Sequence, residues 1–313
     1  MKITIVIPTY NEVDNIESGY ERLRKVTDAC QEYSWEYLYI DNFSTDGTRA
    51  KLRKLAALDN NVKVILNAVN VGWSRSSFYG LMNATGDAAV LLSADMQEPP
   101  EVIPRFLEQY KKGYRIVIGK KTRSKENPLK YFVRKIYYGI LHKMAEIEHI
   151  DQFMGFGLYD RQFLDVLRKL EDPIPYLRGM VAELGGERAE IEYIQETRKH
   201  GKTHFNFWGM YDLAMLGITS YTKVMMRVCT LIGMVIGTVS MILAIITAFL
   251  KIFKIVDYPN GVAAIIVAVM ILGSMILFFV GLLGEYVLSI NQRVMKRPLV
   301  VEEARLNFGL DNE

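Results

Sequence analysis

The stretch Leu91-Leu92-Ser93-Ala94-Asp95-Met96-Gln97-Glu98-Pro99-Pro100-Glu101 guides the interpretation of the whole chain. The apolar run at 88–92 is typical of a buried strand, and it stops at acidic and amide side chains before a Pro-Pro turn. Ligands of open α/β sheets bind at the carboxyl ends of strands, so Asp95 and Gln97 are expected at the mouth of a cleft. Their oxygens suit a hard cation, Mg²⁺ or Mn²⁺, shared with substrate phosphates. On this stretch alone, a strand-end turn with solvated polar side chains explains the pattern equally well.

On the N-terminal side of this stretch, short β-branched runs alternate with segments of helical periodicity. Such alternation predicts the α/β class, with a mostly parallel sheet covered by helices on both faces. The predicted strands are residues 3–7, 35–40, 62–66 and 88–92, with a further strand from 116, and the predicted helices are 15–30, a segment ending at 58, and 73–84.

Polar loops follow three of the predicted strands, at Pro8–Glu12, Asp41–Asp46 and Ser93–Glu98. Because the carboxyl ends of parallel strands share one edge, these loops are expected to form one nucleotide-and-metal site. Turn and capping chemistry explains Asp46, and Ser44 or Asp46 can cap the helix that follows. Asp41, at the strand tip, is the better ligand candidate.

Three motifs together, Ile5–Glu12, Asp41–Thr48 and Ser93–Glu101, resemble family 2 glycosyltransferases with the GT-A fold. The closest resemblance is to the polyprenyl-phosphate glycosyltransferases, the group of dolichyl-phosphate mannose synthase and bactoprenol glucosyltransferase, and it extends along nearly the whole chain. The resemblance implies a metal held by Asp95 and Gln97. It implies that a nucleotide sugar is held by Pro8, Tyr10, Glu12, Asp41, Ser93 and Asp95.

The chain departs from the family pattern at two places. Ser93 stands where the family has the first Asp of Asp-x-Asp, and a hydroxyl is a weaker, neutral metal ligand. Asn42-Phe43 replaces the usual Asp-Gly after Asp41, which is expected to alter recognition of the base.

Basic segments follow the predicted GT-A core. Residues 129–147 are predicted to form a basic amphipathic helix, which would lie at a membrane surface or pack on the sheet with a solvated basic face. Arg198–Thr203 gathers cations around a glycine, a pattern that suits a phosphate but also a solvated basic loop. The predicted lipid-phosphate ligands are Arg123, Arg134, Arg198 and Lys202, and the predicted catalytic residues are Asp95, Arg123 and Arg198.

The C-terminal third predicts membrane association. Residues 228–250 and 261–284 are uncharged and long enough to cross a bilayer. Flanking Lys and Arg residues favour both termini in the cytoplasm, at a bacterial inner membrane. The expected organisation is a GT-A domain at 1–203, interfacial helices at 204–227, a two-helix transmembrane anchor at 228–290, and a C-terminal tail at 291–313.

Composition excludes several other classes of protein. A net charge of +3 is too small to argue for nucleic acid binding, and the two cysteines, Cys30 and Cys229, form no disulfide framework or CxxC metal site. The family resemblance implies a homo-oligomer, a tetramer.

The sequence therefore predicts inverting transfer of a hexose, glucose from UDP-glucose, to the phosphate of a polyprenyl phosphate in the lipid bilayer. One alternative is a processive polysaccharide synthase, although the Gln-x-x-Arg-Trp segment typical of such enzymes is missing. The other is a decayed membrane protein that only binds a nucleotide sugar, with Ser93 as the sign of decay.

Overall fold

The computed structural model describes residues 1–122, 150, 152–170, 172–197, 261–295 and 297–309, with scattered positions between 215 and 253. Within 261–295 several residues are described by their backbone alone. The chain forms two compact units. The first comprises Met1–Tyr138, Ile147–Asn206 and Met295–Glu313, and the second comprises Gly139–Glu146 and Phe207–Val294.

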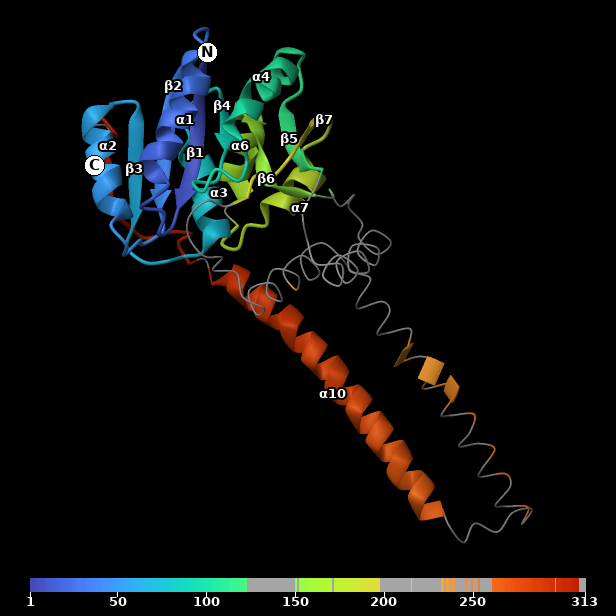
Figure 1. Cartoon of the computed structure of the whole chain (residues 1–313). Helices are drawn as coiled ribbons and strands as arrows, with labels where there is room; N and C mark the ends of the chain where they lie inside the picture. The colour runs from blue at the N-terminus through green and yellow to red at the C-terminus, as the bar shows by residue number, and fades with distance from the viewer. Residues whose placement is uncertain are drawn as a thin grey trace. The chain divides into compact units, whose positions relative to one another are not determined.

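The first unit is built on an eight-stranded sheet in the order β7-β5-β6-β4-β1-β2-β3-β8 (Figure 1). β6 and β8 run antiparallel to their neighbours and the other pairings are parallel, which confirms the predicted mostly parallel sheet. The strands are β1 (Lys2–Thr9), β2 (Ser34–Asp41), β3 (Val62–Asn67), β4 (Ala88–Leu91), β5 (Ile116–Lys121), β6 (Phe153–Asp160), β7 (Arg188–Tyr193) and β8 (Glu302–Leu306).

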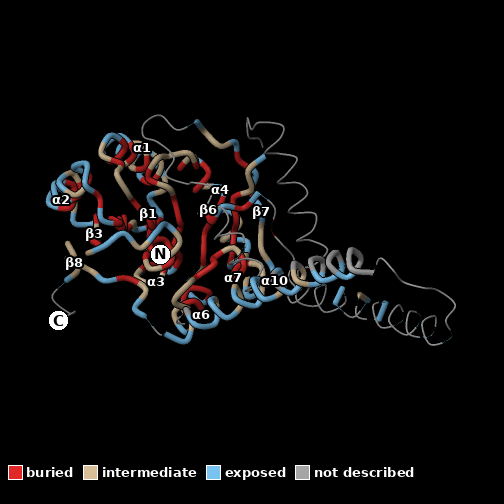
Figure 2. Tube along the Cα trace, turned by 90° about the horizontal axis from the view of Figure 1, so that it is seen from below, coloured by how far each residue is buried: buried red, intermediate tan, exposed pale blue. Residues whose placement is uncertain are grey.

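Helices cover both faces of this sheet and bury its two apolar surfaces (Figure 2). Side chains alternate between the faces of a strand, so Ile5 and Ile7 join one core while Val6 joins the other. The first core is covered by α1 (Ile16–Asp28), α2 (Thr48–Leu58) and α4 (Ile103–Lys111), with the 3-10 turn η1 (Pro100–Val102) before α4, and the second by α3 (Trp73–Asn83), α6 (Arg161–Leu170) and α7 (Leu177–Leu184).

Helix α3 packs directly against the sheet at Gly80. A Cβ atom at Gly80 would lie 2.4 Å from Cγ1 of Val6 and 2.9 Å from Cγ1 of Ile40. Only glycine leaves room for this approach. The packing fixes α3 beneath β1 and β2, the strands whose ends carry two of the polar loops.

Three strands, β6, β7 and β8, were not anticipated from the sequence. β6 and β7 lie in segments for which we predicted no secondary structure. β8 lies in residues 291–313, which we expected to be a tail, and it pairs antiparallel with β3 at the edge of the sheet. The C-terminal strand therefore completes the sheet that the N-terminal residues begin.

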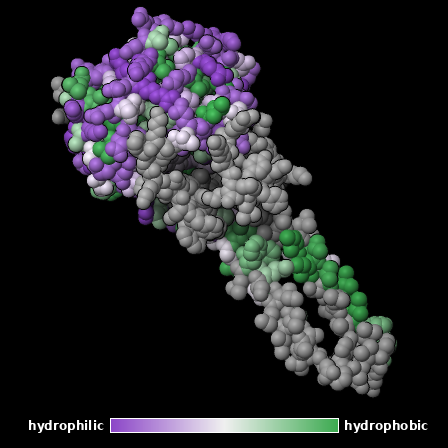
Figure 3. Space-filling view, in the orientation of Figure 1, coloured by the Kyte–Doolittle hydropathy of each residue, from purple (hydrophilic) through white to green (hydrophobic). Residues whose placement is uncertain are grey.

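In the second unit the longest described element is α10 (Gly261–Val294), which includes the predicted span 261–284. Its described side chains include exposed Ile265, Val269 and Ile276. Figure 3 shows hydrophobic residues among the described positions of the second unit. Within the described residues, no helix combines the length and apolar character required of a membrane span. The predicted basic helix 129–147 lies outside the described residues, and the predicted interfacial segment 204–227 lies almost wholly outside them. The predicted span 228–250 is described only at scattered positions.

Candidate active site

The three polar loops meet because their strands are neighbours in the order β4-β1-β2. Thr9 at the end of β1 pairs with Asp41 at the end of β2, and Val6 pairs with Leu91 of β4. All three strands are parallel, so their carboxyl ends open onto one edge. The predicted gathering of these loops at one edge is confirmed.

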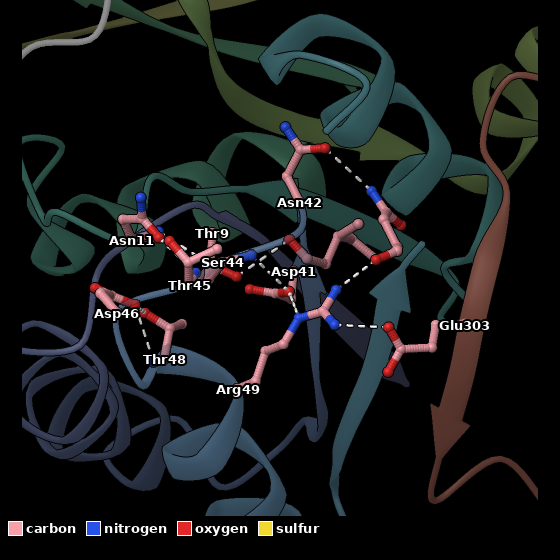
Figure 4. Close-up of polar contacts among 12 residues, drawn as sticks. Thr9, Asn11, Asp41, Asn42, Ser44, Thr45, Asp46, Thr48, Arg49 and Glu303 are labelled. Atoms are coloured by element: carbon pink, nitrogen blue, oxygen red, sulfur yellow. Dashed lines mark hydrogen bonds and ion pairs between the residues drawn. The ribbon is translucent and has the colours of Figure 1, made fainter. Parts of the chain in front are cut away.

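Hydrogen bonds join the loops after β1 and β2 (Figure 4). The backbone N–H of Asn11 donates to Oγ of Ser44 at 2.9 Å, and the N–H of Thr45 donates to Oδ1 of Asn11 at 2.9 Å. The N–H of Glu12 donates to Oγ1 of Thr48 at 2.9 Å. These contacts hold both loops in one conformation.

The N-cap of α2 is Gly47, without a side-chain cap hydrogen bond, so the predicted cap at Ser44 or Asp46 is not observed. Asp46 instead makes turn contacts of the kind predicted for it. Its carboxylate accepts hydrogen bonds from the backbone N–H of Thr48 at 3.0 Å and from the N–H of Val13 at 3.1 Å. Although burial opposes the shift, the hydrogen bonds from Thr48 and Val13 lower the pKa of Asp46. Ser44, the other candidate for capping, instead accepts from Asn11.

Asp41 is fully buried at the tip of β2. Its Oδ2 atom accepts from Nε of Arg49 at 2.6 Å and from the backbone N–H of Ser44 at 3.1 Å. Its Oδ1 atom has no hydrogen-bond partner among the described residues. A buried acceptor without a donor is costly, so a ligand N–H or O–H at this oxygen would stabilise the site.

Arg49 connects Asp41 to the C-terminal strand. Its Nη1 donates to Oε2 of Glu303 in β8 at 2.7 Å, and its Nη2 donates to the backbone carbonyl of Asn67 at the end of β3. Neither Arg49 nor Glu303 was predicted from the sequence. They lie 254 residues apart, and only the pairing of β8 with β3 brings them together.

The loop after β4 carries the predicted metal ligands. The backbone N–H of Gln97 donates to Oδ1 of Asp95 at 3.2 Å, and the N–H of Glu196 donates to the carbonyl of Gln97 at 2.9 Å. Asp95 and Met96 line a small open pocket together with Asn15, Ser18, Gly19, Arg22, Glu196 and Thr197.

Glu98 is a further buried carboxyl group at this edge, and we assigned it no role from the sequence. Its Oε2 atom has no partner among the described residues. Burial raises the pKa of Glu98, with hydrogen bonds from Ser93 opposing the shift and the charge of Asp95 adding to it. Ser93, which replaces the first Asp of the family's Asp-x-Asp motif, therefore interacts with Glu98.

Each of the three loops contains a residue with a left-handed backbone. Asn11, Phe43 and Met96 have φ values of 53°, 65° and 54°. Strained backbone of this kind gathers at functional sites, where surrounding contacts enforce it. The presence of one such residue in each loop supports the location of the site, and this support does not depend on the carboxylates.

The remaining predicted residues divide into two groups. Pro8 is buried within β1, Tyr10 is half-buried in the loop after it, and Oε2 of the largely buried Glu12 accepts from Nδ2 of Asn15 at 2.6 Å. These residues lie at the same edge as Asp41. The four predicted lipid-phosphate ligands, Arg123, Arg134, Arg198 and Lys202, lie outside the described residues.

Comparisons with known proteins agree with this geometry. Residues 4–168 match the model of glycosyl transferase family 2. The chain belongs to this family. It is a glycosyltransferase, and the motif residues described above all fall within the matched region.

Curated relatives match almost the whole chain. A bactoprenol glucosyl transferase of Shigella phage SfX is 30% identical, covering 97% of this chain and 100% of the relative. The uncharacterized glycosyltransferase YkcC of Bacillus subtilis is 29% identical, covering 100% and 96%. Among solved structures, a mannosyltransferase from Pyrobaculum calidifontis is 18% identical with a TM-score of 0.47, covering 69% of this chain and 61% of that one.

The family implies a divalent cation, and Asp95 and Gln97 are suited to hold one. Asp95 faces an open pocket, and both residues offer the oxygen ligands that Mg²⁺ and Mn²⁺ prefer. The described residues contain no cluster of three or more His, Cys, Asp or Glu side chains that would form a closed metal site. A substrate diphosphate would supply further oxygen ligands to a cation at Asp95, and the cation would neutralise the negative charge of the diphosphate.

Proposed function

We propose that this glycosyltransferase transfers a hexose, glucose from UDP-glucose, to the phosphate of a membrane polyprenyl phosphate, with inversion at the anomeric carbon. The observation that carries the proposal is the match to a bactoprenol glucosyl transferase over 97% of this chain and 100% of that relative. A match of this extent includes the segments on both sides of the family 2 domain. It therefore favours a polyprenyl phosphate acceptor over a growing polysaccharide.

The geometry of the site supports a nucleotide donor. Oδ1 of Asp41 is an acceptor that requires an N–H or O–H donor, such as a nucleobase or a ribose offers. Asp95 lines a pocket at the neighbouring strand end, where a cation would bind the diphosphate. The base and diphosphate would thus lie along the adjacent ends of β2, β1 and β4.

The acceptor chemistry explains why the chain requires cations more than a general base. A phosphomonoester has a second pKa of about 6, so it is largely dianionic at neutral pH and already nucleophilic. It needs positioning against the anomeric carbon rather than deprotonation. Arg123, Arg134, Arg198 and Lys202 are proposed to supply that positioning, with Arg binding phosphate oxygens by paired hydrogen bonds.

Membrane attachment remains part of the proposal, at a bacterial inner membrane with the catalytic domain cytoplasmic. Its support is the uncharged sequence of 228–250 and 261–284 and the exposed apolar side chains of α10. The pairing of β8 with β3 adds a constraint, because residues before and after these segments share one sheet. Both ends of the proposed hairpin must therefore lie on the same side of the bilayer. The tetramer likewise remains a prediction.

The test is transfer of isotopically labelled sugar from UDP-glucose to polyprenyl phosphate, followed by extraction of the lipid into organic solvent. Label in the lipid fraction, dependent on Mg²⁺ or Mn²⁺, is the expected result. Label in a long water-soluble polymer would identify a processive synthase. Nucleotide binding without transfer from any of several nucleotide sugars would identify a decayed binding protein. Equal transfer to free polyprenol would refute the phosphate acceptor, because an alcohol must lose a proton as it attacks.

A further inference from the structure

Phe43 is a strained and exposed aromatic residue at the mouth of the site. Its φ of 65° lies in the left-handed region, where a side chain with a Cβ atom is disfavoured by about 1–2 kcal/mol. Its side chain is 41% exposed, in a loop otherwise composed of polar residues and glycine. Neither strain nor exposure of a large apolar ring contributes to folding, so a ligand-binding role is the better explanation for Phe43.

Arg49 holds the Phe43 ring from one side. The guanidinium carbon lies 5.1 Å from the ring centroid, which is cation–π geometry. The same guanidinium is fixed by Asp41, by the carbonyl of Asn67 and by Glu303. A guanidinium fixed by three partners is a stationary cation, and its contact with the ring favours the observed position of Phe43.

The ring is also close in sequence to the buried acceptor at Asp41. Only Asn42 separates the two residues, and the N–H of Ser44 bonds back to the Asp41 carboxylate. A turn this tight keeps the ring near that carboxylate. An aromatic surface next to a hydrogen-bond acceptor matches a nucleobase, which presents a flat face and N–H groups at its edge.

We propose that Phe43 is a stacking surface for the nucleobase of the sugar donor, and that Arg49 and Glu303 are positioning residues that hold it. The inference rests on the proposed nucleotide-sugar donor and adds a residue that contacts its base. It also gives β8 a role in substrate binding, because Glu303 fixes Arg49 from the C-terminal strand.

A different role for Phe43 would be to shield the Asp41–Arg49 ion pair from water. The two roles predict different consequences for nucleotide affinity. A shield matters for stability and has no preference for a planar aromatic side chain. A stacking surface requires the aromatic face and affects only ligands that contain a base.

The experiment measures the affinity of the purified full chain for UDP and for inorganic pyrophosphate, both with Mg²⁺, by calorimetry. Phe43→Gly removes the ring and the strain together, so UDP affinity should fall about tenfold while the melting temperature stays level or rises. Phe43→Tyr should keep UDP affinity within about twofold. Phe43→Leu, which keeps apolar bulk without an aromatic face, should resemble Phe43→Gly. Pyrophosphate has no base, so its affinity should not change.

Gln152→Gly is the matched control for strain relief, because Gln152 is exposed and has a φ of 60°. It should leave UDP affinity unchanged. Glu303→Gln tests the positioning role and should weaken UDP binding by about threefold, with pyrophosphate unaffected. Glu32→Gln, which removes an exposed ion pair to Lys111, is its control and should leave both affinities unchanged.

The outcomes separate this inference from the proposed function. Unchanged or tighter UDP binding in Phe43→Gly and Phe43→Leu would overturn the stacking role while leaving a nucleotide-binding glycosyltransferase intact. An equal loss of UDP and pyrophosphate affinity would also overturn it, because the damage would then not concern the base. If the wild-type chain binds neither UDP nor any other nucleoside diphosphate, the proposed donor and the inference fail together. If Phe43→Gly does not fold, the contrast between Phe43→Leu and Phe43→Tyr decides the matter.

Discussion

Strand β2 carries one buried carboxylate near each end, and the two have opposite surroundings. Glu36, near the start of the strand, is bonded at Oε1 by Thr4 at 2.9 Å and at Oε2 by Lys2 at 2.6 Å and Lys63 at 2.9 Å. Asp41, at the other end, is bonded at Oδ2 alone among the described residues. The difference shows how one strand serves both stability and ligand binding.

The pKa of Glu36 reflects its complete set of partners. Burial alone would raise it, but hydrogen bonds from Lys2, Thr85 and Lys63 outweigh burial and lower the pKa to about 2. At the other edge of the sheet, Glu98 lacks a cationic partner in the described part of the chain, and burial raises its pKa. The two buried carboxyl oxygens that lack a partner among the described residues, Oδ1 of Asp41 and Oε2 of Glu98, therefore both lie at the ligand edge.

The largest expected effect is on catalysis at the ligand edge. Asp95→Asn removes the charge proposed to hold the cation, and sugar transfer should fall about 10²- to 10³-fold. The melting temperature should change little, since Asp95 lines an open pocket. Transfer is measured with saturating UDP-glucose and Mg²⁺ or Mn²⁺, before and after removal of metal by EDTA. The exposed residue Asp28, mutated to Asn, is the control, and full activity in Asp95→Asn would remove this residue from the metal site.

The next effect concerns stability at the structural edge. Glu36→Gln leaves Lys2 and Lys63 near a neutral amide, and the free energy of unfolding should fall by about 3 kcal/mol, with UDP affinity unchanged. The pH dependence has a definite sign. Because the pKa of Glu36 is lowered from 4.5, its contribution is present above about pH 4.5 and is lost as the pH falls toward about 2. The free energies of unfolding of the wild type and the variant, measured by denaturant titration over this range, should therefore converge at low pH. A difference between them that stays constant with pH would contradict the assignment.

Asp41→Asn should lower both the stability of the fold and the affinity for UDP, which distinguishes it from Glu36→Gln. The free energy of unfolding should fall by about 2 kcal/mol, since Arg49 loses a buried partner but keeps Glu303 and the carbonyl of Asn67. UDP affinity should fall about tenfold as the acceptor for the nucleotide is altered. Calorimetric titration with UDP measures the second effect. If Asp41→Asn reduced stability alone, the two ends of β2 would have the same role.

The smallest effect is expected at Glu98. Its raised pKa means that the folded chain binds a proton more tightly than the unfolded chain, so stability decreases as the pH rises from about 4.5. Glu98→Gln removes this penalty. The variant should match the wild type below about pH 4.5 and become more stable above it. Denaturant unfolding at several pH values measures the difference in free energy of unfolding between the variant and the wild type. If the advantage of the variant becomes smaller with rising pH, Glu98 is stabilised as a carboxylate.

Much of the fold and site could be predicted because local patterns determine it. The runs ending at Pro8, Asp41 and Ser93 identified three parallel strands, and adjacent strand ends necessarily bring their loops together. The Asp46 network could also be predicted, because turn chemistry acts over a few residues. The observed contacts of Asp46 with Thr48 and Val13 agree with that prediction.

Long-range partners could not be predicted from the sequence. Glu303 follows a long apolar segment, and only the register of β8 against β3 places it near Arg49. The buried state of Glu98 depends on packing around the end of β4, which a single acidic residue before Pro-Pro does not reveal. The antiparallel strand β6 was missed because its alternation is interrupted by Gly155 and Gly157.

The pairing of β8 with β3 also has a consequence for synthesis of the chain. Ribosomes make proteins from the N-terminus, so β3 is available long before Glu302–Leu306 emerges. During that interval the outer edge of β3 carries unpaired backbone groups, the kind of edge that attracts other strands. The sheet can gain β8 only after residues 194–301, which separate β7 from β8, have been synthesised, so the edge of β3 must stay free of other strands throughout that interval.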